Sequence, residues 1–83
     1  MIVYGVEKLY PLTFREKIRD NRYGRLFIVA CGKTYLVLID DTEKKIYYAS
    51  GLDSRCSEAV EKIRDIGRNI ELYRDRIIYP RQG

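Results

Sequence analysis

The chain has 83 residues, a formal net charge of +4, and a hydrophobic content of 46%. This length favours one domain over residues 1–83, because a second domain would leave neither half large enough for a core. The apolar content is ordinary for a folded domain and argues against wholesale disorder. No apolar run reaches the roughly 18 residues that span a bilayer, so we expect no membrane partner.

The first expected element is a short strand at Ile2–Val6, where β-branched and aromatic residues surround a glycine. A connector follows at Glu7–Leu12. A short helix then begins at Thr13, because Thr13 and Glu16 have the spacing of a capping box. Gly24 is predicted to stop this helix, since glycine readily takes a positive φ.

A β-hairpin is the strongest pattern in the chain. Two apolar runs, Leu26–Ala30 and Tyr35–Ile39, flank the glycine-containing turn Cys31–Thr34. After the polar turn Asp40–Lys45, the run Ile46–Ala49 predicts a third antiparallel strand. The hairpin strands are apolar on both faces, as in a sheet covered on both sides. We therefore expect either helices on opposite faces of the sheet or a second subunit that covers one face.

A second helix is predicted after the third strand, with Asp53 or Ser54 as its N-cap. It ends near Gly67 or Asn69. Its apolar positions recur at helical spacing and form one amphipathic stripe, which comprises Cys56, Ala59, Val60, Ile63 and Ile66.

The last segment, Ile70–Tyr79, starts with apolar and polar residues in alternation and predicts a final strand, broken or bulged near Asp75. The element order is then β-α-β-β-β-α-β. This order predicts an α+β fold with a mainly antiparallel sheet, a three-stranded meander at its centre, and two packed helices. The end of the last strand can pair as an edge across a homodimer, through Ile77, Ile78 and Tyr79.

From Thr13 to Gly67 the predicted order α-β-β-β-α is similar to that of the double-stranded-RNA-binding domain. In that family, a basic cluster at the start of the second helix contacts phosphates. The corresponding place in this chain is Ser54–Ala59, where Arg55 is the single basic residue. The resemblance therefore concerns element order, and it does not carry over the phosphate-binding residues of the family.

Most of the net charge lies in one stretch from Thr13 to Arg25, which has five basic and two acidic residues, whereas residues 26–69 sum to zero. A local basic patch can hold a polyanion. We therefore expect a small regulatory protein that binds DNA or RNA through Arg15, Lys17, Arg19, Arg22 and Arg25. The alternative function is a protein-interaction or homo-oligomeric module without catalytic activity. The basic patch would then be a solvated face in which these side chains pair with nearby acids.

Catalysis has little support in the sequence. The chain has no histidine, which removes the usual general base near neutral pH and the commonest metal ligand. Asp40, Asp41 and Glu43 can in principle hold Mg²⁺, and Glu43 with Lys45 has the spacing of an E-x-K nuclease pair. In those nucleases the pair lies on a strand, whereas here it lies in a polar turn, of which these residues are more typical. We expect no cofactor, no metal site and no catalytic residues.

The tyrosines give a further, weaker hypothesis. Exposed aromatic side chains on a sheet can stack on unpaired bases. Five tyrosines fall on the predicted strands: Tyr35, Tyr47, Tyr48, Tyr73 and Tyr79. Because Tyr47 and Tyr48 are adjacent in a strand, at most one of them can share a given face.

The two cysteines, Cys31 and Cys56, have no metal-like spacing. They are interpreted as two buried thiols, with a disulfide as the alternative. The composition, with 34% charged residues and one methionine, is typical of small proteins from hot-environment archaea or their viruses, some of which keep disulfides inside the cell. The N-terminal residues show no secretory signal, so a cytoplasmic location is expected.

Overall fold

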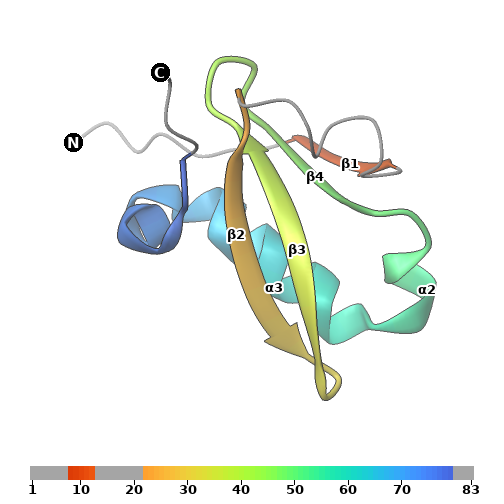
Figure 1. The fold of residues 1–83 in the computed structure, drawn as a ribbon. Helices are drawn as coiled ribbons and strands as arrows, with labels where there is room; N and C mark the ends of the chain where they lie inside the picture. The colour runs from red at the N-terminus through yellow and green to blue at the C-terminus, as the bar shows by residue number, and fades with distance from the viewer. Residues whose placement is uncertain (1–7, 13–21, 80–83) are drawn as a thin grey trace.

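A computed structural model of the chain describes residues 8–12 and 22–79. A mixed sheet packs with helices, which confirms the α+β class (Figure 1). The described elements are β1 (Lys8–Leu12), β2 (Gly24–Ala30), β3 (Lys33–Asp40), β4 (Lys45–Ala49), α2 (Leu52–Arg55), α3 (Ser57–Arg68) and the 3₁₀ helix η1 (Ile70–Arg76). The strand expected at Ile2–Val6 and most of the helix expected from Thr13 lie outside the described residues.

The four strands are arranged in the order β1-β4-β3-β2. β1 is parallel to β4, and the other neighbours are antiparallel. The sheet therefore differs from the predicted three-stranded meander, because β1 lies within the segment that was predicted to be a connector. Pro11 is compatible with β1 because the strand is at an edge, where a missing N–H breaks no ladder.

The predicted hairpin is confirmed by the antiparallel pairing of β2 with β3. Its turn is shorter than expected. It consists of Cys31 and Gly32, which connect the paired residues Ala30 and Lys33. Both turn residues have positive φ, 53° and 71°, as a type I′ turn requires. This turn suits the right-handed twist of the strands, so it fixes the register of the whole hairpin.

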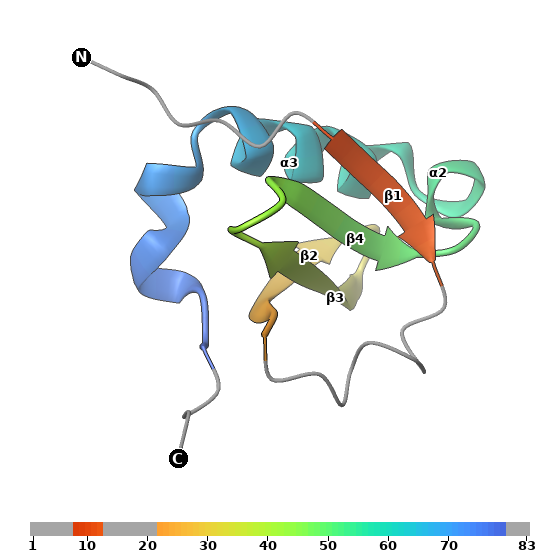
Figure 2. The same cartoon turned by 90° about the horizontal axis from the view of Figure 1, so that it is seen from above.

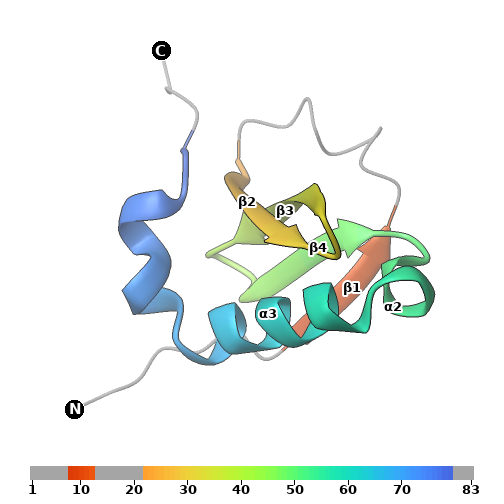
Figure 3. The same ribbon diagram turned by 90° about the horizontal axis from the view of Figure 1, so that it is seen from below.

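Helix α3 crosses one face of the sheet (Figures 2 and 3). Its apolar stripe is confirmed: Ala59, Ile63 and Ile66 are buried, and Val60 is half-buried against the same core. The sheet side of this core includes Leu26, Ile28, Val37, Ile39, Ile46 and Tyr48. Burial of these side chains is the main stabilising term of the domain, at roughly 1.5–3 kcal/mol for each large aliphatic residue.

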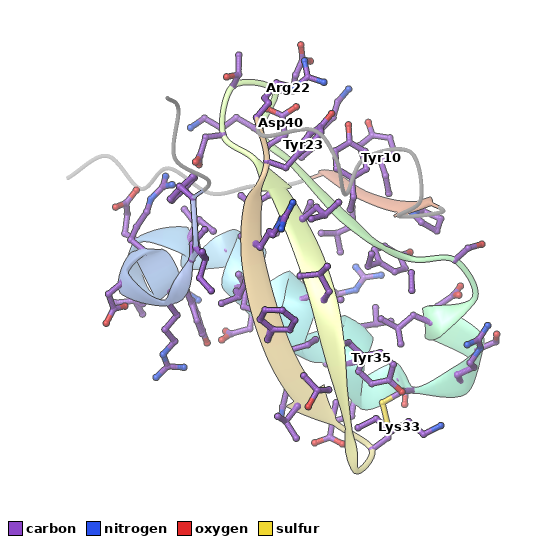
Figure 4. The ribbon with its side chains drawn as sticks, viewed as in Figure 1. Tyr10, Arg22, Tyr23, Lys33, Tyr35 and Asp40 are labelled. Atoms are coloured by element: carbon purple, nitrogen blue, oxygen red, sulfur yellow. A yellow bond between two sulfur atoms is a disulfide. The ribbon has the colours of Figure 1, made fainter. Side chains whose placement is uncertain are left out.

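The start of α3 differs from the prediction. Asp53 and Ser54 lie in the separate short helix α2, and Cys56 is the N-cap of α3. Sγ of Cys56 accepts a hydrogen bond from the N–H of Ala59 at 3.3 Å. Cys56 also forms a disulfide with Cys31, so the interpretation as two free thiols was wrong. The bond joins the hairpin turn to the start of α3, at the end of the sheet where Figure 4 labels Lys33 and Tyr35.

The last segment is not the predicted strand. It forms η1, and only Ile78 pairs with the sheet, in a single antiparallel bridge to Arg25. Ile70 is buried and Tyr73 packs against the same core, a spacing of three that suits the three-residue turn of a 3₁₀ helix. Gly24, predicted to end a helix, instead begins β2, where its missing side chain leaves room for Ile77.

The opposite sheet face, called here the open face, carries a smaller core. The described helices all contribute to the core on the α3 side, so none of the described helices covers this second face. Side chains alternate between the two faces along each strand. On the open face lie Tyr10, Arg25, Phe27, Val29, Leu36, Leu38 and Tyr47.

Candidate functional site on the open face

Strand β2 presents large apolar side chains to solvent on the open face. Phe27 is 56% exposed and Val29 is 62% exposed, whereas Leu26 and Ile28 between them are buried under α3. Ile78 pairs with Arg25 across the bridge, lies on the same face, and is 58% exposed. Phe27 and Val29 follow Arg25 along this face of β2, and together with Ile78 they form an exposed apolar patch. Patches of this kind commonly mark a binding surface.

Three tyrosines, Tyr10, Tyr47 and Tyr23, form a row of ring contacts elsewhere on the open face. The ring of Tyr47 is 5.6 Å from that of Tyr23, edge to face, and 5.7 Å from that of Tyr10. A cation stands over each outer ring: the Arg22 guanidinium is 4.8 Å from the Tyr23 ring, and the Lys45 ammonium is 5.3 Å from the Tyr10 ring. Such contacts hold each cation in place over its ring.

The Arg22 end of the open face is shown in Figure 4, where Arg22, Tyr23 and Asp40 lie together. The guanidinium of Arg22 donates a hydrogen bond to the Tyr23 hydroxyl at 2.6 Å. Asp40 is buried, and its Oδ1 accepts the backbone N–H of Glu43 at 3.0 Å, while Oδ2 has no hydrogen-bond partner within residues 8–12 and 22–79.

Two of the five residues of the predicted basic patch belong to the described part of the chain. Arg22 and Arg25 lie on or beside the open face. Arg15, Lys17 and Arg19 lie outside the described residues, so the predicted arginine row stays a prediction.

The acidic residues of the β3–β4 turn have structural partners. Asp40 bonds to the backbone of the turn, and Asp41 forms an ion pair with Arg74 at 2.6 Å. Glu43 and Lys45 form a salt bridge at 3.6 Å. In the described part of the chain, one group has the proximity that a metal site needs, namely Cys31, Cys56 and Glu58. Both of its sulfur atoms are already joined in the disulfide.

The tyrosines named in the stacking hypothesis do not form an exposed row. Tyr47 and Tyr48 are buried on opposite faces of β4, and Tyr35 and Tyr73 pack against the α3-side core. The most exposed ring on the described part of the open face belongs to Phe27, which sequence reasoning did not single out; Tyr10 is 37% exposed. The apolar run Leu26–Ala30 gave no sign that Phe27 is exposed, because this exposure depends on the position of β2 at the edge of the sheet.

The predicted oligomer residues at the C-terminal end differ in accessibility. Ile77 is buried in the core of its own chain, with 7% exposed, whereas Ile78 and Tyr79 are exposed. Burial and a hydrogen bond donated to Asp41 raise the pKa of the Tyr79 hydroxyl. Whether Ile78 and Tyr79 contact a second copy stays a prediction.

No helix among the described residues is long and apolar enough to cross a bilayer. The disulfide argues weakly against the expected cytoplasmic location, since such bonds are rare in the cytosol outside hyperthermophiles. No protein-family model matches the chain, and neither the curated proteins nor the solved structures include a match.

Proposed function

We propose that the protein binds nucleic acid through the open face, with Phe27 and Arg25 at the centre of the contact. The supporting observation is that an exposed aromatic ring and an arginine lie two residues apart on the same face of one strand. An aromatic ring can stack on an unpaired base, and guanidinium groups contact phosphates. This combination favours a single-stranded ligand over a duplex.

The positive residues outside the described part of the chain fit this proposal. Arg15, Lys17 and Arg19 lie in the segment that connects the end of β1 to the start of β2. In this proposal, they add phosphate contacts to those of Arg22 and Arg25. Such contacts release counterions, so the affinity falls steeply as salt rises. The proposal places the protein in the cytoplasm, with a disulfide of the kind found in intracellular proteins of hyperthermophiles.

The test is to measure binding of single- and double-stranded DNA and RNA of mixed sequence at two salt concentrations. Phe27→Ala removes the stacking ring and should weaken single-strand binding about tenfold, consistent with roughly 1–3 kcal/mol per stacked base. Arg25→Glu should weaken binding to every sequence and reduce its salt dependence. Leu72→Ala and Arg64→Glu change exposed residues of η1 and α3 and are the matched controls. Equal affinities for the four variants and the native chain would exclude the open face as the nucleic-acid-binding surface.

A homodimer without nucleic-acid binding is the second candidate, and the exposed apolar patch favours it. Phe27, Val29 and Ile78 are each more than half exposed and lie on one face. Two copies of such a patch can cover one another around a two-fold axis. Light scattering separates the two candidates: a dimer mass that Ile78→Ser reduces to a monomer, without any nucleic-acid binding at low salt, supports the dimer.

A further inference from the structure

The outer edge of β2 offers unpaired backbone groups. The N–H and C=O of Arg25 exchange hydrogen bonds with Ile78 at 2.8 Å each, and the C=O of Val29 accepts one from the Lys62 ammonium. Alternate residues of a strand direct their backbone groups to the same edge, so the N–H and C=O of Phe27 also point outward. Within the described residues, these two groups and the N–H of Val29 have no hydrogen-bond partner.

A groove of about 650 Å³ runs along this edge. One wall is β2, and the others are α3 and η1. Leu26, Ile28 and Ile66 supply apolar surface, and Tyr73 and Arg76 of η1 border the groove. The Ile78 bridge occupies the position beside Arg25, so the accessible edge extends from Phe27 towards the hairpin turn. This space fits a short extended segment.

The net charge of the groove lining is opposite in sign to that of the whole protein. Three acids, Glu58, Glu61 and Asp65, line it, together with two cations, Lys62 and Arg76. Its lining therefore has a formal charge of −1, in a chain of net charge +4. Glu58 pairs with Lys62 at 3.6 Å, and Asp65 accepts a hydrogen bond from the Tyr73 hydroxyl at 2.8 Å. Glu61 has no ion-pair partner among the described residues.

We propose that this groove binds an extended peptide with basic side chains, which adds to β2 as an antiparallel strand. The peptide backbone exchanges two hydrogen bonds with Phe27 and accepts one from the N–H of Val29. Its side chains on either side of the residue opposite Phe27 point towards α3, where Glu61 lies. A second copy fits less well. Pairing β2 with its own copy would bring two α3 helices to the same face, with their acidic residues opposed.

The probe is a synthetic, end-blocked peptide of alternating lysine and valine. The control peptide has glutamate in place of lysine. Amide exchange of the full-length protein is followed by NMR. The basic peptide should slow exchange at the amides of Phe27 and Val29 by about tenfold, the size of one hydrogen bond. The amides of Leu26 and Ile28 face β3 and should not change, and the acidic peptide should have no effect.

Charge reversal at the groove gives the second readout. Glu61→Lys should weaken binding of the basic peptide at least about fivefold, whereas Asp53→Lys, on α2 outside the groove, makes the same charge change and should leave it nearly unaltered. Three results would overturn the proposal. These are unchanged exchange at Phe27, equal affinities for the two variants, or a dimer in which the Phe27 amide is already protected and the peptide does not compete.

Discussion

The guanidinium of Arg74 lies 2.6 Å from Oδ1 of Asp41 and joins η1 to the turn between β3 and β4. The hydroxyl of Tyr79 donates to the other carboxylate oxygen of Asp41 and accepts from Arg74 at 2.8 Å. Burial alone would lower the pKa of Arg74, but its hydrogen bonds to Asp41 and Glu71 outweigh burial and raise it. This network fixes the segment that places Ile78 beside β2.

Loss of the ion pair should have a modest cost, because both side chains are about one-third exposed. We expect Arg74→Met to lower the free energy of unfolding by about 1 kcal/mol, near the upper end for partly exposed pairs. Urea denaturation measures this difference. Arg64→Met, at an exposed position on α3, is the control, and an equal effect of both substitutions would show that the Arg74 network adds nothing.

Stability should fall at alkaline pH because two tyrosine hydroxyls hold their protons more tightly in the folded state. A hydrogen bond to Asp65, then burial, raises the pKa of Tyr73, and burial followed by the bond to Asp41 raises that of Tyr79. Their contribution is fully present below about pH 10, the ordinary tyrosine value, and is lost as pH rises through the folded-state values.

The double variant Tyr73→Phe/Tyr79→Phe therefore should lose less stability than the native chain between about pH 9 and pH 11. Urea unfolding at several pH values gives the slope of the free energy of unfolding against pH for each of the two proteins. Leu72→Ala, at an exposed position of η1, changes no titratable group and should keep the native slope. Parallel curves for the native chain and the double variant would contradict the prediction.

Removal of the disulfide should be the largest single loss of stability. Cys31 and Cys56 are 25 residues apart, and a cross-link that closes a loop of this size in the unfolded chain stabilises the fold by about 3.5 kcal/mol. Serine at both positions is the suitable replacement, because serine keeps an N-cap acceptor for α3. The urea midpoint of this variant should match that of the reduced native protein. A midpoint unchanged by either treatment would mean that the cross-link does not stabilise the fold.

Gly24→Ala should also destabilise the protein, for a steric reason. A Cβ at this position would lie 2.6 Å from Cγ2 of Ile77 and 2.9 Å from Cε1 of Tyr79. We expect a cost of about 1–3 kcal/mol, as for other overpacked sites, and faster amide exchange at Arg25 as the bridge to Ile78 weakens. Ser50→Ala, at an exposed position, is the control. Native exchange at Arg25 in the glycine variant would show that the C-terminal segment adjusts without loss.

The parts of the fold that depend on neighbouring residues were predictable. The hairpin required only two apolar runs around Cys31–Gly32, and the buried face of α3 followed from the spacing of Ala59, Ile63 and Ile66. The disulfide could only be an alternative, because the proximity of Cys31 and Cys56 depends on how the hairpin packs on α3.

The parts that depend on tertiary contacts were missed. β1 contains Pro11 and is stabilised by parallel pairing with β4, a partner that no local pattern reveals. The alternation at the start of Ile70–Tyr79 predicted a strand, but the two residues that pack on the core, buried Ile70 and partly buried Tyr73, are three residues apart. The exposure of Phe27 likewise depends on the position of β2 at the sheet edge, which composition does not reveal.

The pairing of β1 with β4 has a consequence for the order of folding. β2–β3 and β3–β4 join neighbours in the chain, whereas Lys8 has to meet Lys45 across the whole intervening hairpin. Closing a long loop costs more entropy than closing a short one, so we expect the β1–β4 ladder to form after the hairpin. During synthesis the first described strand therefore emerges without its partner, and it completes the sheet only after Lys45–Ala49 has left the ribosome.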